Sequence, residues 1–397
     1  MLINKDSLKN VKVLTTDPER RIGLFAIRYF GRAGAEVDGI ADGNSSEEPI
    51  GFSSRYINKK IYTQHGERLE KFKNYLVGHS KYYDLVYPVD VSRMLSVIEA
   101  NEEYGLECKY LLPKKDSLIV ADNKELLIQH AQKMGLSCPR TLFRISEGEL
   151  EKICRKEITY PCVIKFRGDQ RETHWKPEER YSIVRSPEEL LIEYRRMHGI
   201  EEFPIIQEYI KGGGYGYSAL FDKSHRLRAQ FCHKRLREYP ISGGPSSCAE
   251  SYYHEELVSL GRRLLESLDW TGIAMVEFKF DEARKRFFII EVNPRLWGSL
   301  PLAIHSGVNF PVLHAMAALD MDFEDVLSYK LGVKVRFIDK DIKSIIGNIL
   351  KEKGYLKKVE LLLQIFNVKI KDGLIELDDI GPVLKSIGHK VFQYYTH

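Results

Sequence analysis

Two glutamates, Glu277 and Glu291, lie on either side of a short charged stretch, and their spacing indicates a site for a cation. They belong to two runs rich in β-branched and aromatic residues, 273–280 and 287–292, separated by the sequence DEARKR. Such runs around a turn predict a β-hairpin. Glu277 lies four residues before the turn and Glu291 five after it, which places them opposite each other to within one residue. Facing carboxylates repel unless a cation lies between them.

Mg²⁺ suits this position because it takes oxygen ligands and is usually held by one or two carboxylates together with substrate phosphates. Strand alternation predicts that Phe287, Ile289, Glu291 and Asn293 share one face of the second strand. Asn293 and then Arg295 prolong the polar row beyond Glu291. The alternative is an exposed glutamate pair on a solvated sheet face, and the row of Glu, Asn and Arg argues against it.

Several basic side chains are candidates to meet an anion. Lys124 follows a predicted helix cap at Asp122, with Glu125 three residues further on. Lys165 lies in the predicted strand YPCVIKF, where a charge is costly without an anionic partner. The alternatives are a solvated helix residue for Lys124 and a structural ion pair for Lys165.

A basic run, HKRLR, ends another predicted strand, residues 226–237. Alternation places His233, Arg235 and Arg237 on one face. A solvated strand edge is the simpler interpretation of each residue alone, and Arg235 is the one we expect to contact a substrate or phosphate group.

The elements around these residues predict three regions. Residues 1–115 contain two strand–helix units and predict a Rossmann-like parallel α/β domain, although the turn at 15–21 lacks the GxGxxG glycines of a dinucleotide site. Residues 116–320 alternate strands with capped helices, including caps at Ser146 and at Ser186-Pro187. Residues 321–397 carry Lys-rich, Leu/Ile-patterned segments and predict a small helical appendage.

Composition is that of an ordinary globular protein, with 397 residues, a formal charge of +4 and 43% hydrophobic residues. The charges are interspersed, which argues against nucleic acid as a partner. No apolar run approaches the length of a membrane span, and the first ten residues lack a signal-peptide core, so we expect a cytoplasmic protein without a membrane partner. Six cysteines without a CxxC pair fit reduced thiols.

The order of these features resembles the ATP-grasp superfamily. The resemblance covers residues 110–310, through the segments PCVIKFRG, IIQEYIKGGGYGYSALFD and EVNPRLWGS. The last is similar to the corresponding segment of carbamoyl phosphate synthetases and biotin carboxylases. HKRLREYPISGGPSSCAES resembles ATP-grasp carboxylate-amine ligases. The resemblance implies a mixed α/β and α+β protein with a two-lobed nucleotide-binding region.

Carried over position by position, the resemblance implies ATP and Mg²⁺ as cofactors, with Mn²⁺ as a substitute. It makes Lys124 and Lys165 phosphate ligands, and Arg295 a ligand of the acyl phosphate and the substrate carboxylate. The implied hinge strand at the adenine consists of Glu208, Tyr209 and Ile210. The implied metal ligands are Glu277, Glu291 and Asn293. The sequence departs from the family at the flap, residues 168–181, which has one glycine and several charges.

Three functions remain open from the sequence. The first is an ATP-dependent ligase that joins a small carboxylate to an amine, or to a thiol, through an acyl phosphate. The second activates bicarbonate, and the third is a regulatory protein that holds ATP without turnover. The assembly is open, with a homodimer as the default expectation.

Overall fold

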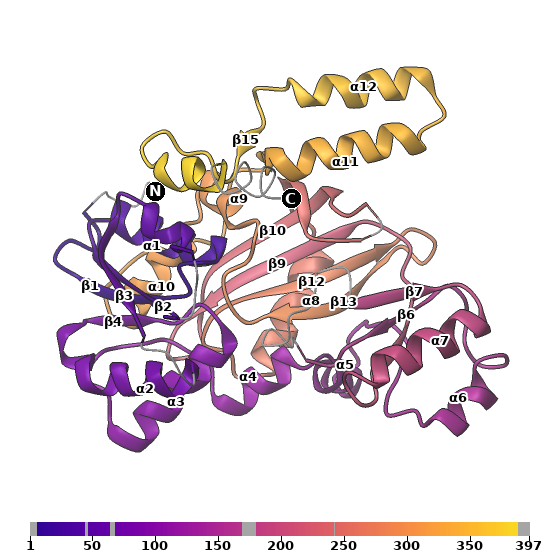
Figure 1. Cartoon of the computed structure of the whole chain (residues 1–397), viewed down its shortest axis with the longest axis horizontal. Helices are drawn as coiled ribbons and strands as arrows, with labels where there is room; N and C mark the ends of the chain where they lie inside the picture. Colours follow the sequence, from indigo (N-terminus) through magenta and orange to yellow (C-terminus); the bar gives the residue numbers. More distant parts are fainter. Residues whose placement is uncertain (1–5, 44–46, 64–67, 169–179, 242, 388–397) are drawn as a thin grey trace.

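The computed structural model describes residues 6–43, 47–63, 68–168, 180–241 and 243–387. Three β-sheets organise this part of the chain, one parallel and two mainly antiparallel (Figure 1). Each sheet forms the centre of a separate lobe, and the largest sheet lies between the other two.

The first lobe contains a four-stranded parallel sheet in the order β3-β2-β1-β4. This confirms the parallel α/β prediction, although strand β3 and helix α2 were not expected. All six residues of β3 are exposed or partly exposed, so its sequence lacks the apolar alternation of an inner strand, which is typical of an edge strand. The strands are β1 (Lys12–Thr16), β2 (Glu36–Ala41), β3 (Ile57–Tyr62) and β4 (Leu85–Tyr87). The helices are α1 (Arg21–Arg32), α2 (Arg68–His79) and α3 (Val91–Tyr104), with short 3-10 turns η1 (Ile50–Ser53) and η2 (Ser80–Tyr82).

Two helices, α4 (Lys115–Asp122) and α5 (Lys124–Lys133), lead out of this lobe. The predicted cap of α5 is wrong by one residue. Asp122 ends α4, and Asn123 caps α5 by accepting hydrogen bonds from the backbone N–H groups of Glu125 and Leu126 at 3.0 and 3.1 Å. Because α4 continues through Asp122, the cap of α5 is the next residue with a side-chain acceptor, Asn123.

The second lobe, which we call the small lobe, contains the antiparallel sheet β5-β8-β6-β7. Both predicted caps are confirmed: Ser146 and Glu149 form a complete capping box, and Ser186 caps a helix that starts with Pro187. The elements are β5 (Thr141–Leu142), α6 (Glu147–Ile153), β6 (Cys162–Lys165), β7 (Tyr181–Val184), α7 (Pro187–His198) and β8 (Ile205–Glu208).

The largest sheet has seven strands in the order β13-β12-β9-β10-β11-β14-β15. Helix α8 (Glu255–Glu266) covers one face, because Leu257, Leu260, Leu264 and Leu265 follow the helical period and are buried. Helices α9 (Leu300–His305) and α10 (Phe310–Ala318) cover the other face together with α1 of the first lobe. The strands are β9 (Gly214–Phe221), β10 (Leu227–Glu238), β11 (Ser246–Ser251), β12 (Gly272–Asp281), β13 (Arg286–Asn293), β14 (Lys334–Arg336) and β15 (Lys371–Asp372).

The predicted hairpin is β12–β13, and Glu277 pairs directly with Glu291. The prediction that Phe287 and Ile289 share a face with Glu291 is wrong. Glu277 pairs with Glu291 while its neighbour Phe278 pairs with Ile289, so the extra residue Ile290 forms a bulge. Phe287 and Ile289 therefore pack in the core beside α8, and the strand changes face before Glu291.

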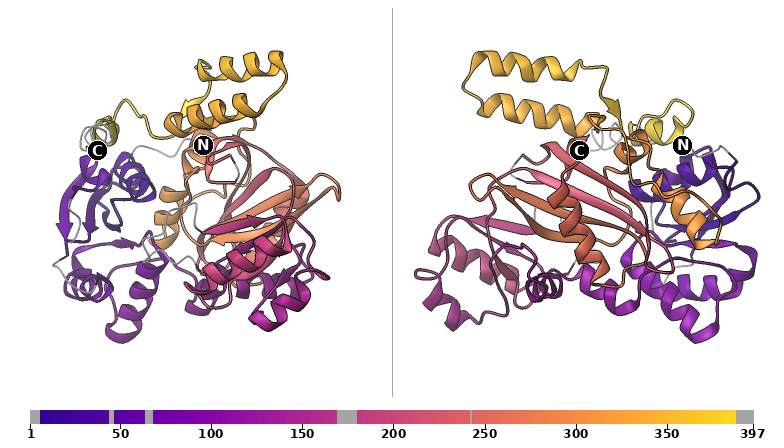
Figure 2. Two further views of the ribbon diagram at one scale, coloured as in Figure 1. Left: turned by 45° about the vertical axis from the view of Figure 1, so that its right-hand side comes forward. Right: turned by 180° about the vertical axis from the view of Figure 1, so that it is seen from behind.

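The C-terminal region contains the expected helices, α11 (Ile338–Lys351) and α12 (Tyr355–Ile365), which form a hairpin at one edge of the molecule (Figure 2). It also supplies strands β14 and β15 to the largest sheet, which the sequence did not predict. Residues 373–387 then return to the first lobe, where Asp379 forms a fully buried ion pair of 2.9 Å with Arg28 of α1. The domain limits at residues 115 and 320 stay predictions.

Candidate functional site

The paired glutamates of the hairpin are the centre of a charged cluster. Asn293 Nδ2 donates to Glu277 Oε1 at 3.2 Å, and the guanidinium of Arg235 binds the other carboxylate oxygen of Glu277. Lys124 Nζ, from the start of α5, lies 3.6 Å from Glu291 Oε2. The fold therefore brings Lys124 and Arg235, which are distant in the sequence, to the carboxylates and the amide of the hairpin.

The electrostatics of the carboxylates fit a cation. Burial raises the pKa of Glu277, the positive charge of Arg235 opposes that change, and repulsion from Glu291 raises the pKa further. In the part of the chain described, no three His, Cys, Asp or Glu side chains form a metal-binding group. A cation here would be held by two carboxylates, by the amide oxygen of Asn293 and by oxygens of a bound ligand, which is the pattern typical of Mg²⁺.

Lys165 faces this cluster from the small lobe. It ends strand β6 and donates from Nζ to Gln207 Oε1 of the neighbouring strand β8 at 2.8 Å. Burial lowers the pKa of Lys165 to about 8, with the charge of Glu291 opposing the shift and that of Lys124 adding to it. The hydrogen-bond partner of Lys165 is therefore the amide of Gln207 and not an acid. The ammonium group keeps further hydrogen-bond donors for a ligand.

Two glycines of β9 leave room for basic side chains of the neighbouring strand β10. A Cβ atom on Gly214 would lie 2.8 Å from Cδ of Arg235, and one on Gly216 would lie 2.3 Å from the His233 ring. Gly216 pairs with both Glu277 and His233, so it lies between the acidic and the basic strands. The short motif GYG in the sequence is the signal that could have predicted this arrangement.

We expect Gly216→Ala to destabilise the protein by about 1–3 kcal/mol, the usual cost of overpacking. The His233 ring is 1% exposed and has no space into which to move. Urea unfolding measures the change, with Gly78→Ala as the control because a Cβ atom there meets nothing within 4 Å. Equal stability of the two variants would contradict the packing argument.

The predicted hinge residues Glu208, Tyr209 and Ile210 lie at the junction of the small lobe and the largest sheet. Strand β8 ends at Glu208, so Tyr209 and Ile210 of the implied hinge strand lie beyond it. The Glu208 carboxylate contacts Arg284 of the β12–β13 turn at 2.8 Å and accepts from the Arg140 N–H at 3.2 Å. Tyr209 is exposed and Ile210 is buried.

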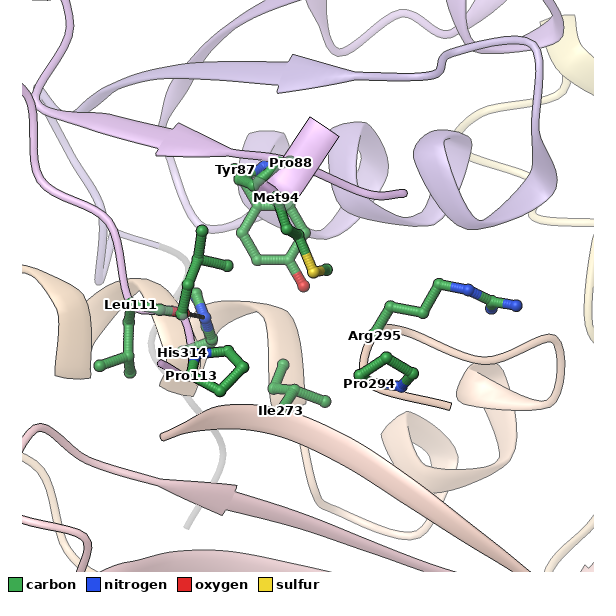
Figure 3. A pocket seen from close by; sticks show the side chains of 10 residues that line it. Tyr87, Pro88, Met94, Leu111, Pro113, Ile273, Pro294, Arg295 and His314 are labelled. Atoms are coloured by element: carbon green, nitrogen blue, oxygen red, sulfur yellow. Dashed lines mark hydrogen bonds between the residues drawn. The ribbon is translucent and has the colours of Figure 1, made fainter. Parts of the chain in front are cut away.

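Arg295 lies beyond the hairpin, where Nη1 donates to the Leu296 carbonyl at 3.0 Å. It also borders a cavity of about 10 Å³, the volume of about one water molecule, between the first lobe and the start of β12 (Figure 3). Figure 3 shows the Tyr87 hydroxyl directed toward this cavity, whereas the Arg295 guanidinium extends away from it. His314 packs against Tyr87 with ring centroids 4.9 Å apart, and its Nε2–H donates to the Leu111 carbonyl, 2.8 Å away. This cavity is a packing gap between two lobes.

The prediction that Arg237 shares a strand face with Arg235 is wrong. The pairing with β11 shifts register between the two, and Arg237 makes a bidentate ion pair with Asp341 of α11, with both distances 2.7 Å. Sequence analysis also missed Glu238, which lies 3.4 Å from Arg235 and 3.9 Å from Lys279. Most of the predicted flap, residues 169–179, lies outside the described residues.

Comparisons with known proteins identify similar folds. Residues 231–341 match a family model described as ATP-grasp in the biosynthetic pathway with Ter operon. The chain is similar to the biotin carboxylase domain of the 2-oxoglutarate carboxylase of Hydrogenobacter thermophilus, at 15% identity and a TM-score of 0.64, covering 81% of this chain and 73% of that chain. For the N5-carboxyaminoimidazole synthetase of Staphylococcus aureus the identity is 11%, the TM-score 0.64 and the coverage 84% and 83%.

The L-amino acid ligase of Bacillus licheniformis is similar at 15% identity and a TM-score of 0.59, covering 78% of this chain and 74% of that chain. The chain has the ATP-grasp fold. The predicted resemblance to the ATP-grasp superfamily is thereby confirmed. A search of curated protein sequences found no match. Lys165 of the small lobe faces the glutamate pair of the largest sheet.

Proposed function

We propose that this ATP-grasp chain is an ATP-dependent ligase that joins a small carboxylate to an amine or a thiol through an acyl phosphate. The observation that carries the proposal is the directly paired Glu277 and Glu291, with Lys124 and Lys165 reaching them from separate elements. Two carboxylates and two ammonium groups are the set that a metal–triphosphate complex needs, because phosphoryl transfer depends mainly on positioning and charge neutralisation.

The residues have distinct proposed roles. Lys165 and Lys124 hold phosphate oxygens, while Tyr209 and Ile210 offer backbone groups to the adenine and Glu208 orients this segment. Glu277, Glu291 and Asn293 would hold Mg²⁺, which when bound neutralises phosphate charge. Arg235 and Arg295 bind the substrate carboxylate, since a guanidinium suits a planar anion.

The proposed reaction has two steps. A carboxylate oxygen of the substrate attacks the γ-phosphorus, the bond to the β–γ bridging oxygen breaks, and ADP leaves. The amine nitrogen or thiol sulfur then attacks the acyl carbon, the acyl–oxygen bond breaks, and phosphate leaves while the nucleophile loses a proton. Arg235 stays close to the developing charge in both steps because Glu277 and Glu238 hold its guanidinium.

The test is ADP release from Mg-ATP across a matrix of small carboxylates, amines and thiols, each with and without bicarbonate. ADP that requires both a carboxylate and a nucleophile supports the ligase. ADP that requires bicarbonate alone supports bicarbonate activation, a second candidate favoured by the similarity to a biotin carboxylase domain. ATP binding without ADP under every mixture would instead support a regulatory protein and contradict the ligase.

The lowered pKa of Lys165 predicts a pH dependence of nucleotide binding. Because its pKa in the free protein is about 8, the ammonium group loses its proton as the pH rises through that value and no longer attracts phosphate. We expect the Kd for ATP to increase between pH 7 and pH 9. Calorimetric titrations at several pH values measure this change.

Lys165→Arg is the control for this dependence, because a guanidinium stays protonated over the whole range. Its ATP affinity should vary less with pH than that of the wild type. Identical pH profiles for the two proteins would show that Lys165 does not set the dependence.

A further inference from the structure

Helix α12 presents an apolar face that no other described part of the chain covers. None of its residues is buried. Six apolar side chains of this helix and the residue after it are exposed, and at 100° per residue they fall on one side of the helix. These six residues, here called the α12 face, are Tyr355, Leu356, Val359, Leu362, Leu363 and Phe366.

The α12 face points away from the rest of the molecule. Leu361 and Ile365, on the opposite side of the helix, are partly buried, and α12 packs against α11. Figures 1 and 2 show α12 as the outermost element of the hairpin. An exposed apolar surface of this extent on a regular helix indicates an interaction site.

The charge around this face is strongly positive. Residues 343–371 contain seven lysines and two glutamates, a formal net charge of +5. The whole chain has a net charge of +4, so the other residues together are close to neutral, at −1. The hairpin itself, residues 338–365, has six lysines, two aspartates and two glutamates, a net charge of +2, and its positive charge is concentrated at the tip. Four of the lysines lie at or beside its tip: Lys351, Lys353, Lys357 and Lys358.

A second copy of the chain is a poor partner for this face. Two hairpin tips with four lysines each would repel each other. Helix α12 has 11 residues and is about 16 Å long, whereas a stable interface buries about 800 Å² per partner. Nucleic acid would meet the lysines but would leave the aliphatic side chains against a polar backbone.

We propose that the α12 face and its surrounding lysines bind an anionic lipid surface. Leucine, tyrosine and phenylalanine side chains enter the boundary between headgroups and acyl chains, and lysines extend their stems to place the ammonium groups among the lipid phosphates. The sequence-based expectation of no membrane partner rested on spanning segments alone. Among the described residues no helix is long and apolar enough to cross a bilayer, and surface binding needs none.

Cosedimentation of the full chain with vesicles tests this proposal. The vesicles contain phosphatidylcholine alone or phosphatidylcholine mixed with phosphatidylglycerol. We expect binding to the mixed vesicles only, weakened by salt because exposed charges are screened. Replacing Lys351, Lys353 and Lys357 by Gln should raise the lipid concentration for half-maximal binding about 100-fold, at about fivefold per lysine.

The apolar contribution is tested with Leu356→Glu/Leu363→Glu, which should abolish binding. The matched control is Ile192→Glu, which removes an equally exposed apolar side chain on α7 and should bind as the wild type does. Circular dichroism confirms that each variant is folded. Equal binding to both vesicle types, binding retained by the leucine variant, or no binding by the wild type would overturn the proposal. A dimer in light scattering that the leucine variant disrupts would assign the face to a second copy.

Discussion

Replacing Glu291 by glutamine lowers the rate of ADP formation by about 100-fold or more, the scale for loss of one preorganised electrostatic group. Glutamine keeps the size of the side chain but removes the negative charge that pairs with Lys124 and faces Glu277. A neutral amide is a weaker ligand for a hard cation than a carboxylate. Coupled-enzyme detection of ADP, with the substrates found by the matrix of carboxylates and nucleophiles, measures the loss.

Glu282→Gln is the matched control, because Glu282 lies in the turn of the same hairpin and its side chain is 68% exposed. It should retain the wild-type rate. Mg²⁺ titrations separate the effect on metal affinity from the effect on turnover. Comparable rates for Glu291→Gln and Glu282→Gln would show that Glu291 takes no part in ADP formation.

Replacing Asp379 by asparagine is expected to lower the free energy of unfolding by about 3–5 kcal/mol, because it leaves the charge of Arg28 buried without its partner. The two side chains are fully buried and 2.9 Å apart. Asp379 also accepts hydrogen bonds from the Ser54 hydroxyl and the Arg55 N–H, both at 2.9 Å. Asparagine can keep only part of this set because one of its two terminal groups is a donor.

Asp378→Asn is the control one residue away. Asp378 also pairs with an arginine, Arg32, but its side chain is 45% exposed, and exposed pairs contribute about 0–1 kcal/mol. Urea unfolding followed by fluorescence and by circular dichroism compares the two variants. Similar losses in both would show that burial does not decide the contribution of the 28–379 pair.

The hairpin and its glutamates could be predicted because the information is local. Two apolar runs and a charged turn fix the register, and the structure has Glu277 directly opposite Glu291. The bulge at Ile290 could not be predicted in the same way. Residues 287–290 are Phe-Phe-Ile-Ile, and four apolar residues in succession carry no alternation that would mark a change of face.

The partners of the site residues were harder to predict because they are distant in the sequence. Gln207, the hydrogen-bond partner of Lys165, is 42 residues away in a strand that only the folded sheet places beside it. The role of Arg235 was proposed from the sequence, but its contact with Glu277 depends on the side-chain-free surface at Gly214. The separation of Arg237 from Arg235 results from another register shift, which the sequence does not mark.

The buried ion pair between Arg28 and Asp379 also restricts the motion of the first lobe. It joins the first lobe to the residues that follow β15. Helices α1 and α10 also share one core, so separating the first lobe from the largest sheet would break several buried interactions. The small lobe contacts the β12–β13 turn through the partly exposed ion pair of Glu208 with Arg284, which contributes about 0–1 kcal/mol. We therefore expect the small lobe to open and close by hinge motion. In the proposed ligase, we expect the nucleotide to enter and leave by motion of the small lobe relative to the rest of the molecule.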